Sequence, residues 1–427
     1  MQAGEVFNVF DYGAVGDGVT DDTSSIQAAL DAAGAAGNAG VLLPAGNFLV
    51  SSTIEVPSGV RFYSDGAERG VGGIKSSVVS SPTINVKNGY FQSIENINIY
   101  HTTPASAGTA VQLIDNDGTG SGTDPAQYFR MRNVRIIDHA TGIRIASEST
   151  WCVFEDVLIE RCTSVSFSIS NANLTVFSRC ISDGSATAWY LENTTKTILD
   201  KCTAQTCTST TVAAISILNC DNVEVNHLWT ERNAFHNVHV RGTSRMTRIQ
   251  EMLNQGAGWD FATSTPTGTG RGIYIDGTSS DTIIDGGWHG GNATEDITIG
   301  VGATETTLID PRSATTLSFT DASGAAFFVS KSISGLSGLS GTSVKANNLR
   351  GSVTISDANT TAAVSFGTAE ADTAFLVIVS ATVSAGTPAA GSTRCYVTNQ
   401  ATSGFTINLE AAPGAGNSVR VSWFIIR

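Results

Sequence analysis

Short apolar strands recur between residues 96 and 275 in two series that share a period of about 22 residues. The first series consists of NINIY at 96–100, NVRII at 133–137, DVLIE at 156–160, RCISD at 179–183, KCTAQ at 201–205 and NVEVN at 222–226. The second series consists of VQL at 111, IRI at 143, FSI at 167, WYL at 189, ISI at 215, VHV at 238 and IYI at 273. Two strand types with one common period predict a parallel β-solenoid in which each period forms one coil.

An amphipathic helix precedes the repeats. Side-chain oxygens that can cap its first turn come from Asp21, Asp22 and Thr23. Apolar residues at helical spacing form its buried face, and they are Ile26, Ala29, Leu30 and Ala33. Gly34 and Gly37 are predicted to end the helix. Such a helix would cover the open edge of the first coil.

The periodicity fades near residue 312, and the chain then changes character. A Gly- and Ser-rich segment predicts a linker or intertwining segment at 313–349. Short alternating strands such as SVTIS, FLVIV and VRVSWFII predict a β-sandwich at 350–427. The expected organisation is therefore a capped β-helix over 1–312, this linker, and a C-terminal β-sandwich, for which the resemblance described below implies trimerisation or receptor contact.

The alternation of side chains predicts which residues of the first series face outward. The fifth position of each segment forms one outward column, which contains Tyr100, Ile137, Glu160, Asp183, Gln205 and Asn226. Glu160 and Asp183 are expected on adjacent strands, about 4.8 Å apart. Two carboxyl groups this close suit the acid and the nucleophile or base of glycoside hydrolysis. The alternative is a solvated polar ladder without a catalytic role.

Further candidates gather at 226–242, in the segment NHLWTERNAFHNVHVRG. Glu231 is a candidate acid or base, Trp229 can stack on a sugar face, and Arg232 can bind anionic groups. His227, which lies beside them, and Arg161, which follows Glu160 directly, are further candidates for substrate binding. Ordinary turn and outward strand positions are the alternative interpretation of these residues.

The second series also presents aromatic and charged side chains on its outward face. Tyr190, His239 and Tyr274 fall in one outward column there, and they are candidates for substrate binding. The same surface is equally typical of an interface between three parallel solenoids.

Composition narrows the possible partners. The 24 Lys and Arg against 38 Asp and Glu give a net charge of −14, which disfavours nucleic acid and anionic membranes. The sequence contains no run of 18 apolar residues, so no membrane span is expected, and no leader pattern follows Met1. Seven cysteines without metal-ligand spacing are predicted to be core residues. The Gly-rich insert at 115–124 lacks calcium-loop spacing, so neither a required metal nor a cofactor is expected.

The opening residues carry a family resemblance. The stretch FNVFDYGAVGDGVTDDTSSIQAALDAA, followed by GVLLPAGNFLVSSTIEVPSGVRF, resembles the N-terminal signature of the pectate-lyase-like right-handed β-helix superfamily. That superfamily includes secreted polysaccharide lyases, hydrolases and bacteriophage tailspikes. The resemblance implies an all-β fold, a right-handed parallel β-helix with an N-terminal capping helix and a C-terminal β-sandwich.

The C-terminal residues are similar to terminal β-domains of phage tail proteins. The resemblance implies a homotrimeric tailspike that binds a bacterial surface polysaccharide, such as capsule or O-antigen, and depolymerises it by hydrolysis. Such a protein would be assembled in the host cytoplasm and held in the virion by a phage tail or baseplate protein. The alternatives are a non-catalytic tail adhesin or structural fibre, and a secreted polysaccharide lyase.

Overall fold

The structure is a computed structural model. It describes residues 5–426 except 66–71, 87–88, 104–107, 115–125, 147, 267, 314–316, 324–325, 330–349, 358, 366–375 and 402. The insert at 115–124 and most of the expected linker therefore lie outside the described residues. The chain divides into two compact units, residues 1–341 and 342–427.

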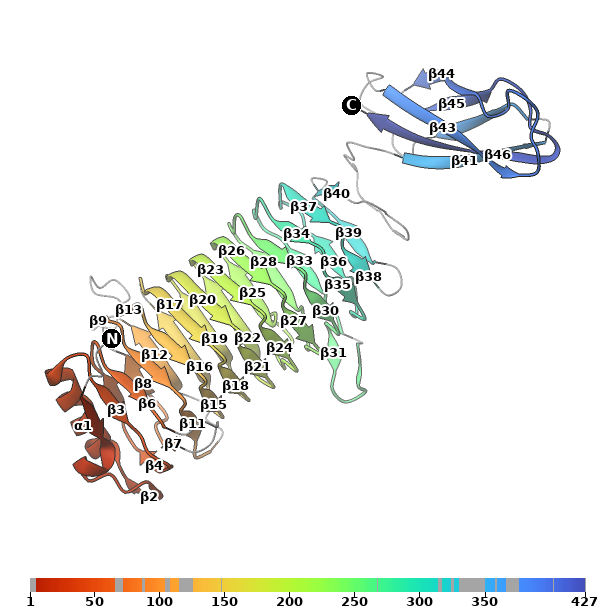
Figure 1. The fold of residues 1–427 in the computed structure, drawn as a ribbon. Coiled ribbons are helices and arrows are strands. Elements are labelled where there is room, and N and C mark those ends of the chain that lie inside the picture. The colour runs from red at the N-terminus through yellow and green to blue at the C-terminus, as the bar shows by residue number, and fades with distance from the viewer. Residues whose placement is uncertain are drawn as a thin grey trace. The chain divides into compact units, whose positions relative to one another are not determined.

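The first unit is a parallel β-solenoid with three sheets, which confirms the predicted fold class (Figure 1). Sheet 1 consists, in the described residues, of β1 (Val6–Asn8), β3 (Gly40–Leu42), β6 (Arg61–Tyr63), β9 (Gly89–Tyr90), β10 (Ser93–Glu95), β13 (Ala126–Gln127), β14 (Arg130–Arg132), β17 (Thr150–Glu155), β20 (Asn173–Ser178), β23 (Thr195–Asp200), β26 (Asp221–Asn226), β29 (Arg248–Gln250), β34 (Ile283–Asp285), β37 (Thr306–Ile309) and β40 (Ala326–Val329). Sheet 2 consists of β2 (Asp17–Asp21), β4 (Gly46–Val50), β7 (Gly72–Ser76), β11 (Asn98–His101), β15 (Arg135–Ile137), β18 (Leu158–Glu160), β21 (Ile181–Asp183), β24 (Thr203–Gln205), β27 (Trp229–Glu231), β30 (Leu253–Gln255), β35 (Trp288–Gly290) and β38 (Arg312–Ser313). Sheet 3 consists of β5 (Ile54–Val56), β8 (Pro82–Val86), β12 (Thr109–Ile114), β16 (Thr141–Ala146), β19 (Val165–Ser170), β22 (Thr187–Glu192), β25 (Ile215–Leu218), β28 (Val238–Arg241), β33 (Ile273–Ile275), β36 (Ile297–Ile299) and β39 (Phe319–Asp321).

The helix α1 (Thr23–Ala36) follows a 3₁₀ turn, η1 (Val9–Tyr12), and buries the predicted apolar face. Two details differ from the sequence prediction. The Asp22 carboxylate makes no cap hydrogen bond to the helix, and it accepts instead from the backbone N–H groups of Val15 and Gly16. Gly34 lies inside the helix rather than at its end. A Cβ on Gly34 would lie 2.8 Å from the Pro57 side chain. The helix ends at Gly37, as its positive φ of 71° allows.

The corner between sheets 1 and 2 has a constant length of two residues from the connection of β10 to β11 up to that of β37 to β38. β17 ends at Glu155 and β18 begins at Leu158, and the connections from β20 to β21 and from β23 to β24 have the same length. The first connecting residue has a positive φ, as at Asp156, Arg179 and Lys201. The second is buried, so each coil enters sheet 2 in the same phase.

Stacked aromatic rings and cysteines fill the solenoid core. Phe154 stacks on Phe177 at 4.9 Å, and Phe167 stacks on Trp189 at 4.7 Å between ring centroids. Buried free cysteines confirm the core positions expected from the sequence, namely Cys152, Cys162, Cys180, Cys202 and Cys220. Burial raises the pKa of the Cys152 and Cys162 thiols to about 12, which makes them unreactive core residues.

His139 is buried between β15 and β16. Its Nδ1 lies 2.9 Å from the Ile137 carbonyl oxygen, its Nε2 lies 3.4 Å from Thr83 Oγ1, and the His101 ring meets it edge-on at 5.4 Å. The pKa of His139 is lowered from 6.5 to about 4, mainly by burial and to a smaller extent by the neighbouring His101. The imidazole is therefore neutral in the folded protein at neutral pH.

The solenoid should lose stability as the pH falls from 6.5 towards 4. In this window the unfolded chain binds a proton at His139 that the folded protein does not, so folding is favoured fully only above pH 6.5. Between pH 7 and pH 5 this histidine should account for about 2 kcal/mol of unfolding free energy. Urea unfolding at both pH values should show that His139→Gln removes this part of the difference. An unchanged pH dependence in the variant would contradict the assignment.

The second unit contains two three-stranded antiparallel sheets in its described residues. One sheet has the order β41 (Arg350–Asp357), β46 (Gly414–Ile426), β43 (Leu376–Ala385), and the other β42 (Thr361–Ser365), β45 (Gly404–Leu409), β44 (Cys395–Ala401). Residues of both sheets share one core, which contains Ile355, Val419 and Val421 from the first and Phe405, Ile407 and Leu409 from the second. The strands of the solenoid continue to β40, and the expected domain bounds at 312 and 350 stay predictions.

Candidate functional site

The three predicted acid–base residues lie in one column on the outer face of sheet 2. Glu160 pairs with Asp183 across β18 and β21, Asp183 pairs with Gln205, and Gln205 pairs with Glu231. We call these four residues the carboxylate column. Adjacent members lie on strands about 4.8 Å apart. The backbone register therefore brings together carboxyl groups that the sequence analysis had assigned to two separate places.

The alignment that placed Asn226 in this column is wrong. Asn226 belongs to sheet 1, where it pairs with Asp200 and Gln250. The segment that continues the first series is HLWTE at 227–231, with His227 at the corner and Glu231 facing outward. Asn222 misleads because it also has a positive φ, of 58°, near the start of β26.

Arginines neutralise much of the charge around the carboxylate column. Arg135 Nε donates to Glu160 Oε2 at 2.5 Å, and Arg232 Nε lies 2.9 Å from Glu231 Oε1. Asp183 accepts a hydrogen bond from the Thr206 hydroxyl. These contacts hold the carboxylates in fixed orientations on a partly exposed face.

The predicted binding residue Arg161 stands at the end of β18. It binds Asp138 through two parallel hydrogen bonds, Nε to Oδ1 at 2.7 Å and Nη2 to Oδ2 at 2.8 Å. The hydrogen bonds to Asp138 raise the pKa of Arg161, and the charges of Glu160 and Asp183 raise it further. Its guanidinium is thus a permanent cation beside the carboxylate column.

His227 does not join this group. It occupies the corner before β27, and its Nδ1 lies 3.4 Å from Asp200 Oδ1 on sheet 1. Trp229 does join it, because it faces outward from β27 in the column next to Glu231 and is 45% exposed.

The remaining predicted residues lie on a different face, the outer side of sheet 3. Tyr190 pairs with Ser216, Ser216 with His239, and His239 with Tyr274, as the sequence predicted for this column. The rings of His239 and Tyr274 stack at 4.8 Å, and His239 Nε2 lies 3.1 Å from Asp276 Oδ2.

Two further residues complete this second group, and the sequence analysis did not place them there. The Arg271 backbone N–H donates to His236 Nδ1 at 2.9 Å, and the Arg271 guanidinium lies 4.9 Å from the centre of the Tyr274 ring. Burial lowers the pKa of His236 to about 3, with the charges of His239 and Arg271 adding to the effect. We call His236, His239, Arg271, Tyr274 and Asp276 the sheet 3 cluster.

The electrostatics of the sheet 3 cluster favour an ionised Asp276. Burial alone would raise the pKa of Asp276, but the hydrogen bond and charge of His239 lower it overall. Burial raises the pKa of Tyr274, and Asp276 contributes to that shift. Next to this group Arg241 Nε and Ser216 Oγ are buried without a hydrogen-bond partner in the described part of the chain.

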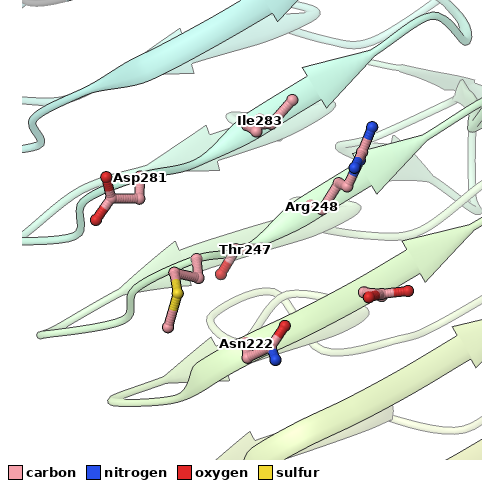
Figure 2. A pocket seen from close by; sticks show the side chains of 7 residues that line it. Asn222, Thr247, Arg248, Asp281 and Ile283 are labelled. Atoms are coloured by element: carbon pink, nitrogen blue, oxygen red, sulfur yellow. The ribbon is translucent and has the colours of Figure 1, made fainter.

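A recess of about 380 Å³ lies elsewhere, over sheet 1, and it contains none of the predicted residues (Figure 2). Its lining includes Glu224, Arg248 and Asp281, and Arg248 Nη2 lies 3.6 Å from Asp285 Oδ2. In the described residues no group of three or more His, Cys, Asp or Glu side chains is arranged to hold a metal ion. The described helices are all too short or too polar to span a membrane.

Comparison with known proteins places the fold. Residues 6–213 match the family model described as rhamnogalacturonase A/epimerase, pectate lyase-like. The chain is 48% identical to mannuronan C5-epimerase AlgE4 of Azotobacter vinelandii over 73 residues, which are 17% of this chain and 13% of that protein. The chain therefore matches only a small part of this relative's length.

Two solved structures share the fold over nearly the whole chain. Dettilon tailspike protein aligns with a TM-score of 0.51 and 11% identity, over 99% of this chain and 94% of its own. The enzymatically active domain of bacteriophage CBA120 tailspike protein 2 aligns with a TM-score of 0.51 and 12% identity, over 99% of this chain and 70% of its own. The matched family model identifies residues 6–213 as similar to pectate-lyase-like proteins, and the observed solenoid and the two solved structures are consistent with the right-handed β-helix fold of that superfamily.

Proposed function

We propose that this protein binds a bacterial surface polysaccharide and depolymerises it by glycoside hydrolysis on the outer face of sheet 2. The carboxylate column carries the proposal, because Glu160 and Asp183 are in register on adjacent strands. Such a pair can supply one carboxylic acid that protonates the glycosidic oxygen and one carboxylate that attacks the anomeric carbon or activates water. Glu231, two strands beyond Asp183, is the third candidate acid or base.

The surrounding side chains suit a glycan ligand. Trp229 offers an exposed indole next to Glu231, and a sugar ring can stack its C–H face on such a surface. Arg161 and Arg232 stand at the ends of β18 and β27, where they can bind hydroxyl or acidic groups. The proposed ligand is a capsular or O-antigen polysaccharide.

The protein that we propose is a homotrimeric tailspike, held in a virion by a phage tail or baseplate protein. Support for this role comes from the two tailspike proteins that share the fold. Sedimentation equilibrium of the purified chain tests the trimer: a mass three times that of one chain is expected, and a monomer would contradict it.

Incubation of purified capsular and O-antigen polysaccharides with the protein tests the activity. Shorter chains with new reducing ends are expected for hydrolysis. Products with ultraviolet-absorbing unsaturated ends would show a lyase instead. Binding to a polysaccharide that is never shortened would leave a non-catalytic adhesin.

A second candidate activity, proton abstraction from an acidic sugar, is favoured by the sheet 3 cluster. His239 lies beside Asp276 and is stacked on Tyr274, and its imidazole can accept a proton from the carbon next to a uronate carboxylate. Arg241, whose Nε is unpaired, can neutralise that carboxylate. The similarity to an epimerase of mannuronan adds to the case for acidic-sugar chemistry. Loss of activity in His239→Gln, with full activity in Glu160→Gln, would establish this alternative.

A further inference from the structure

Two exposed tryptophans stand in one column of sheet 2. Trp229 pairs with Leu253, and Leu253 pairs with Trp288. Both indoles are 45% exposed. Two strand steps of about 4.8 Å separate the tryptophans by about 9.6 Å along the solenoid axis. We call Trp229, Leu253 and Trp288 the tryptophan column, and it runs beside the carboxylate column.

The faces of these two indoles are not covered by other rings. Neither tryptophan packs against another aromatic ring in the described parts of the chain, whereas three exposed rings at a different corner stack on one another. There Phe91 lies 5.0 Å from Tyr128, and Tyr128 lies 6.0 Å from Trp151. Stacked rings cover each other's faces, so the tryptophan column is the better platform for a planar apolar surface such as a pyranose C–H face.

A glycine leaves room beside Trp288. If the carboxylate column is continued past Glu231, its next positions are Gln255 and Gly290, which pair with each other. Gly290 has no side chain at this outward position. Gly290 lies within β35 and does not have a positive φ, so backbone geometry does not require glycine there. A Cβ at this position would contact only Ser313 Oγ, at 3.4 Å. Glycine inside a strand is typical of a place where another molecule approaches closely.

A hairpin bounds the same face. β31 (Trp259–Asp260) and β32 (Thr265–Pro266) form it between β30 and β33, and Figure 1 shows it projecting from the solenoid. Its base is fixed, because Trp259 N–H donates to the Asn233 carbonyl at 2.8 Å. Phe261 near its tip is 45% exposed.

The charge of this face allows an approach by neutral or acidic sugars. Glu160 and Glu231 are each paired with an arginine, although the whole chain carries a net charge of −14. Arg312 pairs with Trp288 across β38 and β35, and it extends the tryptophan column with an exposed cation. An acidic substituent on the glycan would find this cation beyond Trp288.

We infer that the tryptophan column is a glycan-binding track parallel to the solenoid axis, with pyranose rings stacked on Trp229 and Trp288. The inference rests on the proposed function for its ligand class, a bacterial polysaccharide. It adds that binding extends from the coil of Glu231 through the next two coils to Trp288, in the direction of Arg312. It also adds that the track binds glycan independently of cleavage.

Affinity electrophoresis through gels that contain purified capsular or O-antigen polysaccharides tests the track. The variants are Trp229→Ala and Trp288→Ala, each in an Asp183→Asn background that prevents hydrolysis. Each is expected to weaken binding by about tenfold or more, as for truncation of an aromatic binding anchor. Trp151→Ala is the matched control, since Trp151 is 50% exposed on a different corner and should leave binding unchanged.

The outcomes separate the track from the hydrolase proposal. Retardation that depends on both tryptophans, in a protein that shortens no polysaccharide, would support the track and overturn hydrolysis. Retardation equal to the wild type in both variants would overturn the track, even if the wild-type protein cleaves the glycan. Weakened binding in Trp151→Ala alone would also overturn it.

Discussion

Glu160→Gln should lower the rate of polysaccharide cleavage by about 10²–10⁴-fold, the contribution typical of one acid–base group. The amide can still accept the hydrogen bond from Arg135, so the local geometry should persist. It cannot act as a nucleophile, base or proton donor. Asp183→Asn should have a similar effect, and the double variant should be little worse than either single one, because paired catalytic groups act as a unit. Initial rates of reducing-end formation measure all three.

Glu155→Gln is the matched control for this prediction. Glu155 is also an outward carboxylate near an arginine, with Arg130 Nε 3.8 Å from its Oε2, but it lies on sheet 1. It should retain the wild-type rate. Wild-type activity in Glu160→Gln, with an intact fold, would remove the carboxylate column from the chemistry and direct attention to the sheet 3 cluster.

Trp189→Ala should destabilise the solenoid by about 3–5 kcal/mol, the usual cost of truncating a buried aromatic side chain. Trp189 is fully buried, stacks on Phe167 with the rings 6° from parallel, and meets Phe177 edge-on at 6.4 Å. Urea unfolding followed by circular dichroism measures the change.

Trp151→Ala serves here too as the control, because it removes the same side chain from a half-exposed position. It should cost less than about 1 kcal/mol, as most surface substitutions do. Equal destabilisation by the two variants would contradict the assignment of Trp189 to the core.

The solenoid and its outward columns could be predicted because most inward residues of the coils are apolar. That pattern produces the common period and the alternation in DVLIE and RCISD, and it correctly paired Glu160 with Asp183. The position of Glu231 could not be predicted in the same way. Each of the coils around it has several residues with positive φ, such as Asn219, Asn222 and His227, so NVEVN as well as HLWTE begins with such a residue.

The separate column of Tyr190, His239 and Tyr274 was predicted from the second strand series, but the lengths of the connections between the two faces were not. The connection between sheets 2 and 3 varies in length. Between β18 and β19 it consists only of residues 161–164, whereas between β30 and β33 it consists of residues 256–272. Residues close together in the sequence, such as Trp229 and His239, are therefore carried to different sheets. Trp288 was missed because GGWHG at 286–290 bears little resemblance to HLWTE, although both place a tryptophan at the third position.

The two-residue corner before sheet 2, which is constant from β10 onward, separates two tasks that often conflict in evolving proteins. Insertions after sheet 2, of which the β31–β32 hairpin is an example, lengthen a coil without changing the phase of the next strand of that sheet. Loops that border the face can therefore diversify while the spacing of the face itself is inherited unchanged. A chimeric chain that exchanges such loops between relatives should keep the strand register of sheet 2. New specificities can therefore arise by exchange of the bordering loops, without changes to the sheet surface between them.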